Sequence, residues 1–245
     1  LTSSAIAISE PGAGGDPAGM KTKAVKDGND WVINGRKIWI SRIAKADFTI
    51  AMAVTDTALG SRGGITAFLI DKGTPGFNVL RRIPMLGGQY SYEIALEDCR
   101  VPGWKLLGKE GQGFAPMQVR LSTRRIEMAA WCIGLAQRAL DMMTEYAPQR
   151  VTFGQPLSQR QAVQWWAADA ATKIHAMRLM TYDCAWKIDE GRDTRSEISM
   201  IKSFCIESAY EIVDHAMQLF GGMGMTRELP LYLMSNKLRT MRIYD

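Results

Sequence analysis

The sequence is poor in the residues that usually build metal and redox sites. Its 245 residues include two histidines, His175 and His215. Both fall within helical patterns, where we expect them to have surface or packing roles. No zinc-binding or Cys-x-x-Cys spacing links the four cysteines, which are Cys99, Cys132, Cys184 and Cys205. We therefore predict no metal site, and we interpret the cysteines as buried free thiols of a reducing compartment.

Membrane and nucleic-acid signals are also missing. No apolar run approaches the ~18 residues that a membrane-spanning helix needs, and the opening Leu1-Thr2-Ser3 has no basic segment typical of a signal peptide. The net charge of +5 is modest, and no compact basic run is interleaved with aromatic residues. With 47% hydrophobic and 22% charged residues, the chain is typical of a soluble globular protein. We predict no membrane span, no nucleic-acid partner, and a bacterial cytoplasmic or mitochondrial matrix location.

The first part of the chain, residues 1–110, has the pattern of a β-domain. Short runs rich in β-branched and aromatic residues alternate with Gly-Gly, Thr-Pro-Gly and Asp-Gly-Asn turns. This pattern predicts an antiparallel β-barrel or sandwich. The expected strands are Ala5–Ser9, Thr22–Lys26, Trp31–Ser41, Phe48–Thr55, Ile65–Asp71, Phe77–Arg82 and Tyr92–Leu96.

Residues 111–245 have a helical pattern instead. Apolar residues recur every three or four positions with few helix breakers. Thr194 is a candidate N-cap, with Glu197 three residues later as in a capping box. Four long helices joined by short loops predict a bundle, so the fold class is α+β. The expected helices are 112–146, 158–190, 194–220 and 231–242.

A glycine-rich segment, Ser9-Glu-Pro-Gly-Ala-Gly-Gly-Asp16, precedes a predicted strand–turn–strand unit that ends at Trp39-Ile-Ser41. Such a loop lets backbone N–H groups approach an anion or an aromatic ring, although many Pro/Gly clusters are plain turns. Together with the distal Gly221-Gly-Met-Gly224, these segments resemble the acyl-CoA dehydrogenase family of flavoenzymes. The resemblance covers nearly the whole chain.

The resemblance implies FAD as cofactor, held between the β-domain and the helical bundle, with acyl-CoA alongside it. The family's N-terminal helical domain is missing from this sequence, so we interpret the chain as an internal segment of a longer protein. An electron-transfer flavoprotein is the implied electron acceptor. Alternatives of the same fold are a nitroalkane oxidase, an acyl-CoA oxidase or a flavin monooxygenase, and a non-catalytic fragment is also left open.

The resemblance also assigns flavin contacts in the β-domain. Ile6, Ile8 and Ser9 are expected on the strand that lines the isoalloxazine ring. Gly14 and Gly15 are expected near the pyrophosphates of FAD and, for Gly15, of the CoA substrate. The indole of Trp39 is expected beside the flavin, with the alternative of a strand tryptophan in the core. The hydroxyl of Ser41 is expected near flavin N5.

A second group is expected to reach the FAD of a neighbouring subunit, which implies a homodimer or homotetramer. Arg150 and Phe153 follow the first long helix, and Gln218, Gly221 and Gly222 end the third. A solvated or capping arginine and a glycine helix C-cap are the alternative interpretations.

The catalytic base is expected at Asp245, the position after Tyr244 where most relatives carry a glutamate. One branch of the family carries aspartate there, and the stretches Gly87-Gly-Gln89, Tyr92-Glu-Ile94 and Arg100-Val-Pro102 resemble that branch. Some relatives carry the base on the first long helix instead, but that position is Arg124, whose guanidinium stays charged. Glu127 lies one turn further and does not match. Arg125 and Tyr244 are the implied substrate contacts, together with Gly15, and a solvated helix arginine is the alternative for Arg125. The alternative for Asp245 is a carboxylate with no catalytic role.

Overall fold

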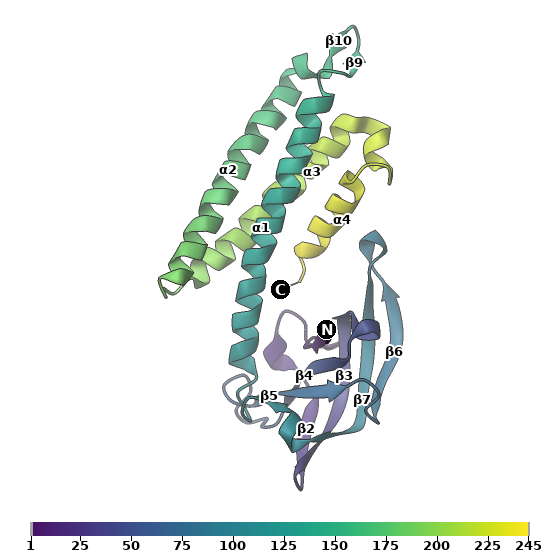
Figure 1. Ribbon diagram of the computed structural model, residues 1–245, viewed down its shortest axis with the longest axis vertical. Coiled ribbons are helices and arrows are strands. Elements are labelled where there is room, and N and C mark those ends of the chain that lie inside the picture. The colour runs from purple at the N-terminus through teal and green to yellow at the C-terminus, as the bar shows by residue number, and fades with distance from the viewer. Residues whose placement is uncertain (1, 245) are drawn as a thin grey trace. The chain divides into compact units, whose positions relative to one another are not determined.

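The computed structural model describes residues 2–244. The chain forms two compact units, divided in sequence between Val119 and Arg120 (Figure 1). The first is built mainly from strands and the second mainly from helices.

The first unit contains an eight-stranded mixed sheet in the order β6-β7-β3-β2-β4-β5-β8, with β1 beside β4. Its strands are β1 (Ser4–Ala7), β2 (Lys23–Asp27), β3 (Asp30–Ser41), β4 (Phe48–Val54), β5 (Ile65–Asp71), β6 (Phe77–Pro84), β7 (Tyr90–Pro102) and β8 (Leu106–Leu107). Short 3-10 turns lie between them: η1 (Pro17–Gly19), η2 (Ile43–Lys45), η3 (Leu86–Gly88) and η4 (Gly103–Lys105).

Two pairings in this sheet differ from the expected antiparallel arrangement. β1 pairs with β4 in parallel. β2 also pairs with β4 in parallel, between Lys23 and Val54. Parallel pairing needs a long connection, and the residues between β1 and β4 include a complete hairpin. The remaining pairs are antiparallel.

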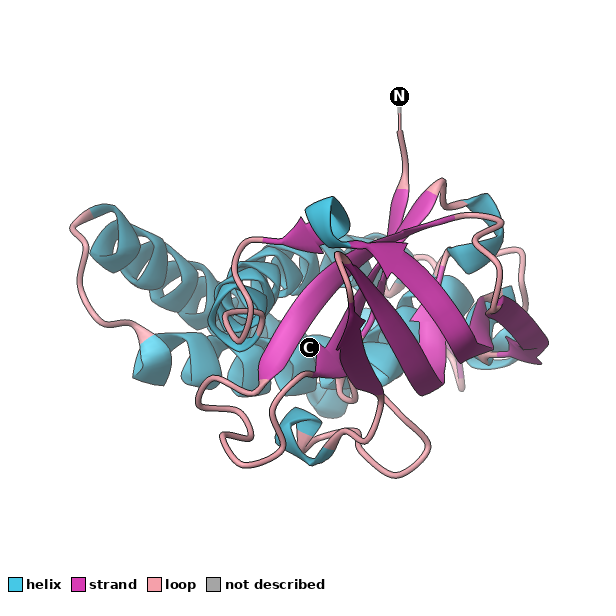
Figure 2. Cartoon of the chain, turned by 90° about the horizontal axis from the view of Figure 1, so that it is seen from below, coloured by secondary structure: helices cyan, strands magenta, loops and turns pink. Residues whose placement is uncertain are grey.

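The sheet of residues 2–244 does not close into a barrel, since its path ends at β6 and β8. Figure 2 shows its strands splayed across one another with a strong twist. Trp31 of β3 packs edge-on against Phe68 of β5, with ring centroids 5.4 Å apart, although these strands are not neighbours in the sheet. The twisted sheet therefore encloses its own apolar core, which fits the sandwich alternative and not the barrel.

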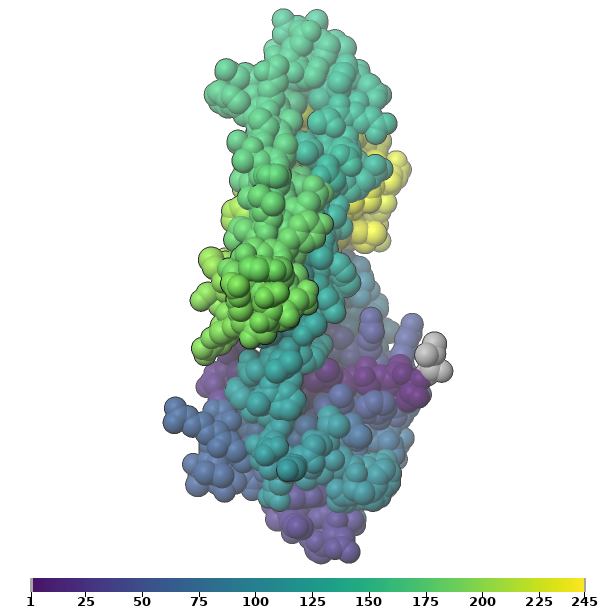
Figure 3. Space-filling view, turned by 60° about the vertical axis from the view of Figure 1, so that its left-hand side comes forward, coloured from purple at the N-terminus to yellow at the C-terminus, as the bar shows by residue number. Residues whose placement is uncertain are grey.

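The second unit contains the four predicted helices, close to their expected bounds. They are α1 (Phe114–Tyr146), which begins before the division between the units, α2 (Gln161–Asp189), α3 (Arg195–Phe220) and α4 (Leu231–Met241). Between α1 and α2 lie a hairpin of β9 (Val151–Thr152) and β10 (Gln155–Pro156) and the turn η5 (Leu157–Gln159), and η6 (Gly221–Met225) follows α3. Helices α1 and α2 lie side by side in Figures 1 and 3. The helices of this unit share one apolar core, and Met128 of α1, Met177 of α2 and Leu238 of α4 are among its fully buried residues.

Smaller expectations have mixed outcomes. Thr194 occupies the N-cap of α3 but makes no side-chain capping bond. The partner expected for it, Glu197, instead accepts a 2.8 Å hydrogen bond from Lys187, because an opposite charge competes with the cap. All four cysteines are buried and free. His175 is exposed, whereas His215 stacks on Trp166 with the ring centroids 4.7 Å apart.

Within residues 2–244, no helix is long and apolar enough to cross a membrane.

Candidate functional site

The glycine-rich loop begins just after β1. The strand ends at Ala7, so Ile8 and Ser9 follow the strand and do not lie on it as expected. Beyond Ala7 the chain no longer pairs with β4. The carbonyl of Ser9 instead accepts a 2.9 Å hydrogen bond from the N–H of Ile38 on β3. Ile6, Ile8 and Ser9 are half-buried. The backbone of Ser9 is therefore fixed while its side chain keeps access to a ligand.

The loop itself turns through reciprocal backbone bonds between Glu10 and Ala13, of 2.8 and 3.1 Å. Gly14 and Gly15 are exposed, and neither has the positive φ that would require glycine. A Cβ added at either position would meet no atom of this chain within 4 Å. The fold of this unit therefore does not require these glycines, whereas close approach of a ligand to the backbone would.

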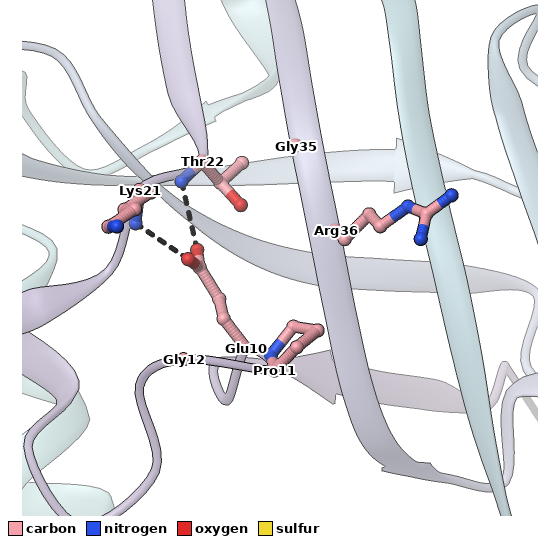
Figure 4. Close-up of a pocket in the computed structure, with 7 residues that line it drawn as sticks. All are labelled: Glu10, Pro11, Gly12, Lys21, Thr22, Gly35 and Arg36. Atoms are coloured by element: carbon pink, nitrogen blue, oxygen red, sulfur yellow. Dashed lines mark hydrogen bonds between the residues drawn. The ribbon is translucent and has the colours of Figure 1, made fainter.

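Glu10 and Lys37 form a buried ion pair at the base of this loop, which the sequence analysis did not identify. Lys37 is fully buried, and its ammonium donates to Glu10 Oε1 at 2.8 Å and to the carbonyl of Ile8 at 3.0 Å. Glu10 also accepts the N–H groups of Lys21 and Thr22, toward which its carboxylate points in Figure 4. Strand alternation offered a signal, because Lys37 shares its odd-numbered face with Trp31 and Ile33.

The pair shifts the pKa values of both groups. Burial opposes ionisation of Glu10, but the charge of Lys37 and hydrogen bonds from Lys37, Thr22 and Lys21 together lower its pKa below the ordinary value. Burial lowers the pKa of Lys37, an effect that Glu10 offsets only in part. The pKa of Lys37 is therefore lowered by its burial, whereas that of Glu10 is lowered by the charge and the hydrogen bonds of its neighbours.

A small pocket opens beside this pair. Its volume is about 260 Å³, and it is lined by Glu10, Pro11, Gly12, Lys21, Thr22, Gly35 and Arg36 (Figure 4). Gly35 is required here, because a Cβ on it would come within 2.3 Å of Thr22 Oγ1. None of the expected flavin or substrate residues lines this pocket.

Trp39 is exposed because β3 is irregular at this point. The register between β3 and β7 shifts between Lys37 and Ile40, and Trp39 has a φ of 64°. The shift places Lys37 and Ile38 both inward and leaves Trp39 53% exposed. The alternative of a core tryptophan is therefore wrong. Ser41, at the end of the same strand, is also exposed.

Phe153 lies at the tip of the β9–β10 hairpin in the helical unit. It is 98% exposed and has a φ of 51°, and Gly154 follows with a φ of 76°. Two successive positive φ angles define the turn type that favours Asn-Gly, so phenylalanine is unfavourable there. Arg150, just before β9, is exposed, and its N–H donates to the carbonyl of Tyr146.

The end of α3 presents the other expected cross-subunit residues. Gln218 is exposed, and its carbonyl accepts the N–H of Gly221. Gly221 has φ 61° and ψ −135°, a conformation that glycine alone adopts readily, so it does act as the helix C-cap. Gly222 differs, because its φ is not positive and a Cβ there would point into open space.

The expected base, Asp245, is outside the described residues. Its neighbour in sequence, Tyr244, is half-buried, and the Tyr244 carbonyl accepts a hydrogen bond from Lys202. Arg125 on α1 is half-buried as well. Arg124 binds the carboxylate of Glu127 and lies over Trp131, 4.6 Å from the ring centre.

Lys237 of α4 lies 4.8 Å from the centre of the Trp131 ring. Within the helical unit, Trp131 therefore has cations from both α1 and α4 against it. Among residues 2–244, no group of three or more histidine, cysteine or carboxylate side chains could hold a metal ion.

Comparison with known proteins assigns the chain to a family. Residues 5–99 match the model of the acyl-CoA dehydrogenase middle domain, and residues 111–245 match that of the C-terminal domain. The chain belongs to the acyl-CoA dehydrogenase family. It is 40% identical over 244 residues to the (R)-benzylsuccinyl-CoA dehydrogenase of Thauera aromatica, which covers 99% of this chain and 60% of that protein.

Two solved structures have the same fold as this chain. Butyryl-CoA dehydrogenase from Megasphaera elsdenii matches with a TM-score of 0.90 at 34% identity, over 98% of this chain and 63% of that one. The FAD complex of PigA matches with a TM-score of 0.93 at 34% identity, over 99% of this chain and 63% of that one. The chain thus spans about 60% of the length of the relatives it matches.

Proposed function

We propose that the intact protein catalyses FAD-dependent α,β-dehydrogenation of an acyl-CoA thioester and that this chain supplies most of its flavin-binding surface. Family membership supports the reaction class, because the (R)-benzylsuccinyl-CoA and butyryl-CoA dehydrogenases are similar to this chain over nearly all its residues. The FAD complex of PigA supports the cofactor.

The observation that carries the proposal is the state of two aromatic residues. Trp39 and Phe153 are both exposed, and both have a positive φ, which few non-glycine residues share in the described chain. Each conformation costs folding free energy, and such strain is typical of ligand sites. These are two of the positions at which the family resemblance expects an aromatic residue against FAD.

The other residues at the expected contacts fit FAD as well. Gly14, Gly15 and Gly222 leave open space where a side chain would otherwise block a ligand. Ser9 is half-buried and Ser41 is exposed. Arg150 is an exposed cation of the kind that binds a pyrophosphate. We infer that the residue roles are those expected above, with Arg150, Phe153, Gln218, Gly221 and Gly222 reaching the FAD of a neighbouring subunit.

The chemistry divides between the cofactor and this chain. FAD, when bound, accepts the substrate's β-hydrogen as hydride. Asp245 removes the acyl α-proton, and its backbone N–H contributes to polarising the thioester carbonyl. Burial by the acyl chain would raise the pKa of the Asp245 carboxylate toward that of the carbon acid. Arg125, Tyr244 and Gly15 hold the acyl-CoA.

The partners and the division of labour complete the proposal. Residues 1–110 bind flavin and acyl-CoA, and residues 111–245 bind flavin, mediate a homodimer or homotetramer and supply the base. An electron-transfer flavoprotein would reoxidise the enzyme, and the reaction would take place in the bacterial cytoplasm or the mitochondrial matrix as a step of fatty-acid oxidation.

The test is the Asp245→Asn variant of the intact enzyme, mixed anaerobically with a panel of acyl-CoAs while flavin absorbance is followed. Asn is nearly isosteric, so substrate binding should persist while flavin bleaching slows by ~10²–10⁴-fold, the usual contribution of a general base. Asp189→Asn, an exposed carboxylate at the end of α2, is the matched control and should bleach at the parent rate. Bleaching of the Asp245→Asn enzyme at the parent rate would remove Asp245 from the mechanism.

A further inference from the structure

The Glu10–Lys37 pair connects the two segments that carry the flavin residues of the β unit. Lys37 lies on β3 directly before the register shift that exposes Trp39. Its ammonium bonds to the Ile8 carbonyl, one residue before Ser9, and to the Glu10 carboxylate, one residue after it. The adjacent Ile38 N–H binds Ser9 itself at 2.9 Å. Two contacts therefore link the Ser9 segment to the Trp39 segment: the Lys37 side chain and the hydrogen bond from the Ile38 N–H to the Ser9 carbonyl.

Glu10 also closes the glycine-rich loop. Its two carboxylate oxygens accept the Lys21 N–H at 2.6 Å and the Thr22 N–H at 2.9 Å, and these residues follow the loop and the turn η1. One carboxylate thus holds the start of the loop against the segment that follows it, and Gly14 and Gly15 lie between these two points. Both glycines are exposed, and a Cβ on either would meet no atom of this chain within 4 Å, so we infer that their position depends on these two points.

Folding stability alone does not account for this arrangement. The attraction within a buried ion pair must offset the hydration free energy that both charges lose on burial, and replacing the pair with apolar residues of similar volume often leaves a protein as stable. The charged groups add directionality, because Glu10 and Lys37 together make five hydrogen-bond contacts whose geometry fixes three chain segments. An apolar pair would hold these segments together without fixing their register.

We propose that Glu10 and Lys37 are positioning residues for the flavin: they set the glycine-rich loop and the Trp39 segment in the arrangement that binds the cofactor. This inference rests on the proposed function. Neither side chain touches the cofactor; each acts through the backbone of residues 8–22 and through the irregular part of β3.

The test uses three variants of the intact protein: Lys37→Met, Glu10→Gln, and both together. Arg100→Met is the matched control, because Arg100 forms an ion pair with Asp27 and Asp30 in the same sheet but on its exposed surface. The readouts are the dissociation constant of FAD for apoprotein, the visible absorption spectrum of bound flavin, and the melting temperature without FAD. Soluble, folded protein is selected by size-exclusion chromatography before titration.

We expect each single variant to bind FAD more weakly by on the order of 10- to 100-fold, the cost typical of removing a residue that orients direct ligands. The flavin bands should shift, because the indole of Trp39 no longer keeps one position. The double variant should lose less than the product of the single losses, since the two residues act as a unit. Arg100→Met should match the parent in FAD affinity and spectrum.

A purely structural pair would give another result. The melting temperature would then fall in the variants, while the folded fraction kept the parent's FAD affinity and flavin spectrum, and the proposal would be overturned. If Lys37→Met does not fold, Glu10→Gln and the double variant decide by the same criteria. Failure of the proposed function is separate: the parent itself would then bind no FAD or would not be bleached by any acyl-CoA.

Discussion

Replacing Phe153 with asparagine should stabilise the protein without cofactor and weaken its hold on FAD. A left-handed conformation costs a typical L-residue about 1–2 kcal/mol, and asparagine adopts it more readily. Phe153 has a φ of 51° and precedes Gly154 in the turn that favours Asn-Gly. Because its side chain is 98% exposed, its removal forfeits almost no burial within the subunit. The net expectation is a gain of about 1 kcal/mol in the free energy of unfolding.

The two effects are measured separately. In a protein of this size or larger, 1 kcal/mol corresponds to a rise of about 2 °C in the melting temperature of FAD-free protein. An aromatic contact is worth about 0.5–1.5 kcal/mol, so the dissociation constant of FAD should rise by about 2- to 12-fold. Val151→Thr is the control, because Val151 is exposed on the same hairpin but has regular backbone geometry. Unchanged FAD affinity in Phe153→Asn would refute the argument from strain to function, and a lower melting temperature would refute the estimate of strain.

Three further outcomes follow from the same structure. Gly14→Ala should leave the melting temperature of FAD-free protein unchanged but weaken FAD binding, whereas Gly221→Ala should lower that melting temperature, because its φ and ψ suit glycine alone; equal melting behaviour of the two would contradict this. The four cysteines should resist thiol reagents at pH 8 until the protein unfolds, since burial raises the pKa of Cys99 and Cys205 to about 11 and that of Cys132 to about 12; fast labelling of native protein would count against their burial. Ionised Glu10 stabilises the fold above its ordinary pKa of 4.5, and this contribution is lost as the pH falls through its lower folded value; in denaturant titrations below pH 4.5, Glu10→Gln should lose less unfolding free energy than the parent.

The helices were predictable from the sequence to within a few residues. Apolar residues at three- and four-residue spacing mark α1 to α4, and the structure buries residues such as Met128, Met177 and Leu238 on those faces. Seven of the eight strands of the β unit were also found, because turn residues separate them, whereas the two-residue strand β8 was missed and β7 extends to Pro102, beyond the expected Leu96. Their parallel pairings were not found, since pairing between β1 and β4 depends on residues some 40 positions apart.

The candidate site was harder to predict. The loop and Trp39 were recognisable as a motif, but the exposure of Trp39 depends on a register shift that no periodicity indicates. Strand alternation could have indicated that Lys37 is buried, but its partner Glu10 lies 27 residues earlier in a loop. A buried ion pair of this kind becomes visible only when the two segments are placed together. The end of β1 at Ala7 was missed for the same reason, because the bond from Ile38 to Ser9 crosses between segments.

The open edge of the sheet at β6 has a consequence for solubility. An exposed edge strand offers unpaired backbone groups on which another chain could add a strand, and such addition begins aggregation. β6 carries Arg81 and Arg82 along this edge and ends at Pro84, which has no N–H to donate. Arg81 is held by Glu93 at 2.6 Å, and Arg82 lies over the ring of Tyr90. These charges make chain-to-chain stacking costly, so replacing both arginines with valine should convert a tolerated edge into a nucleus for insoluble assembly.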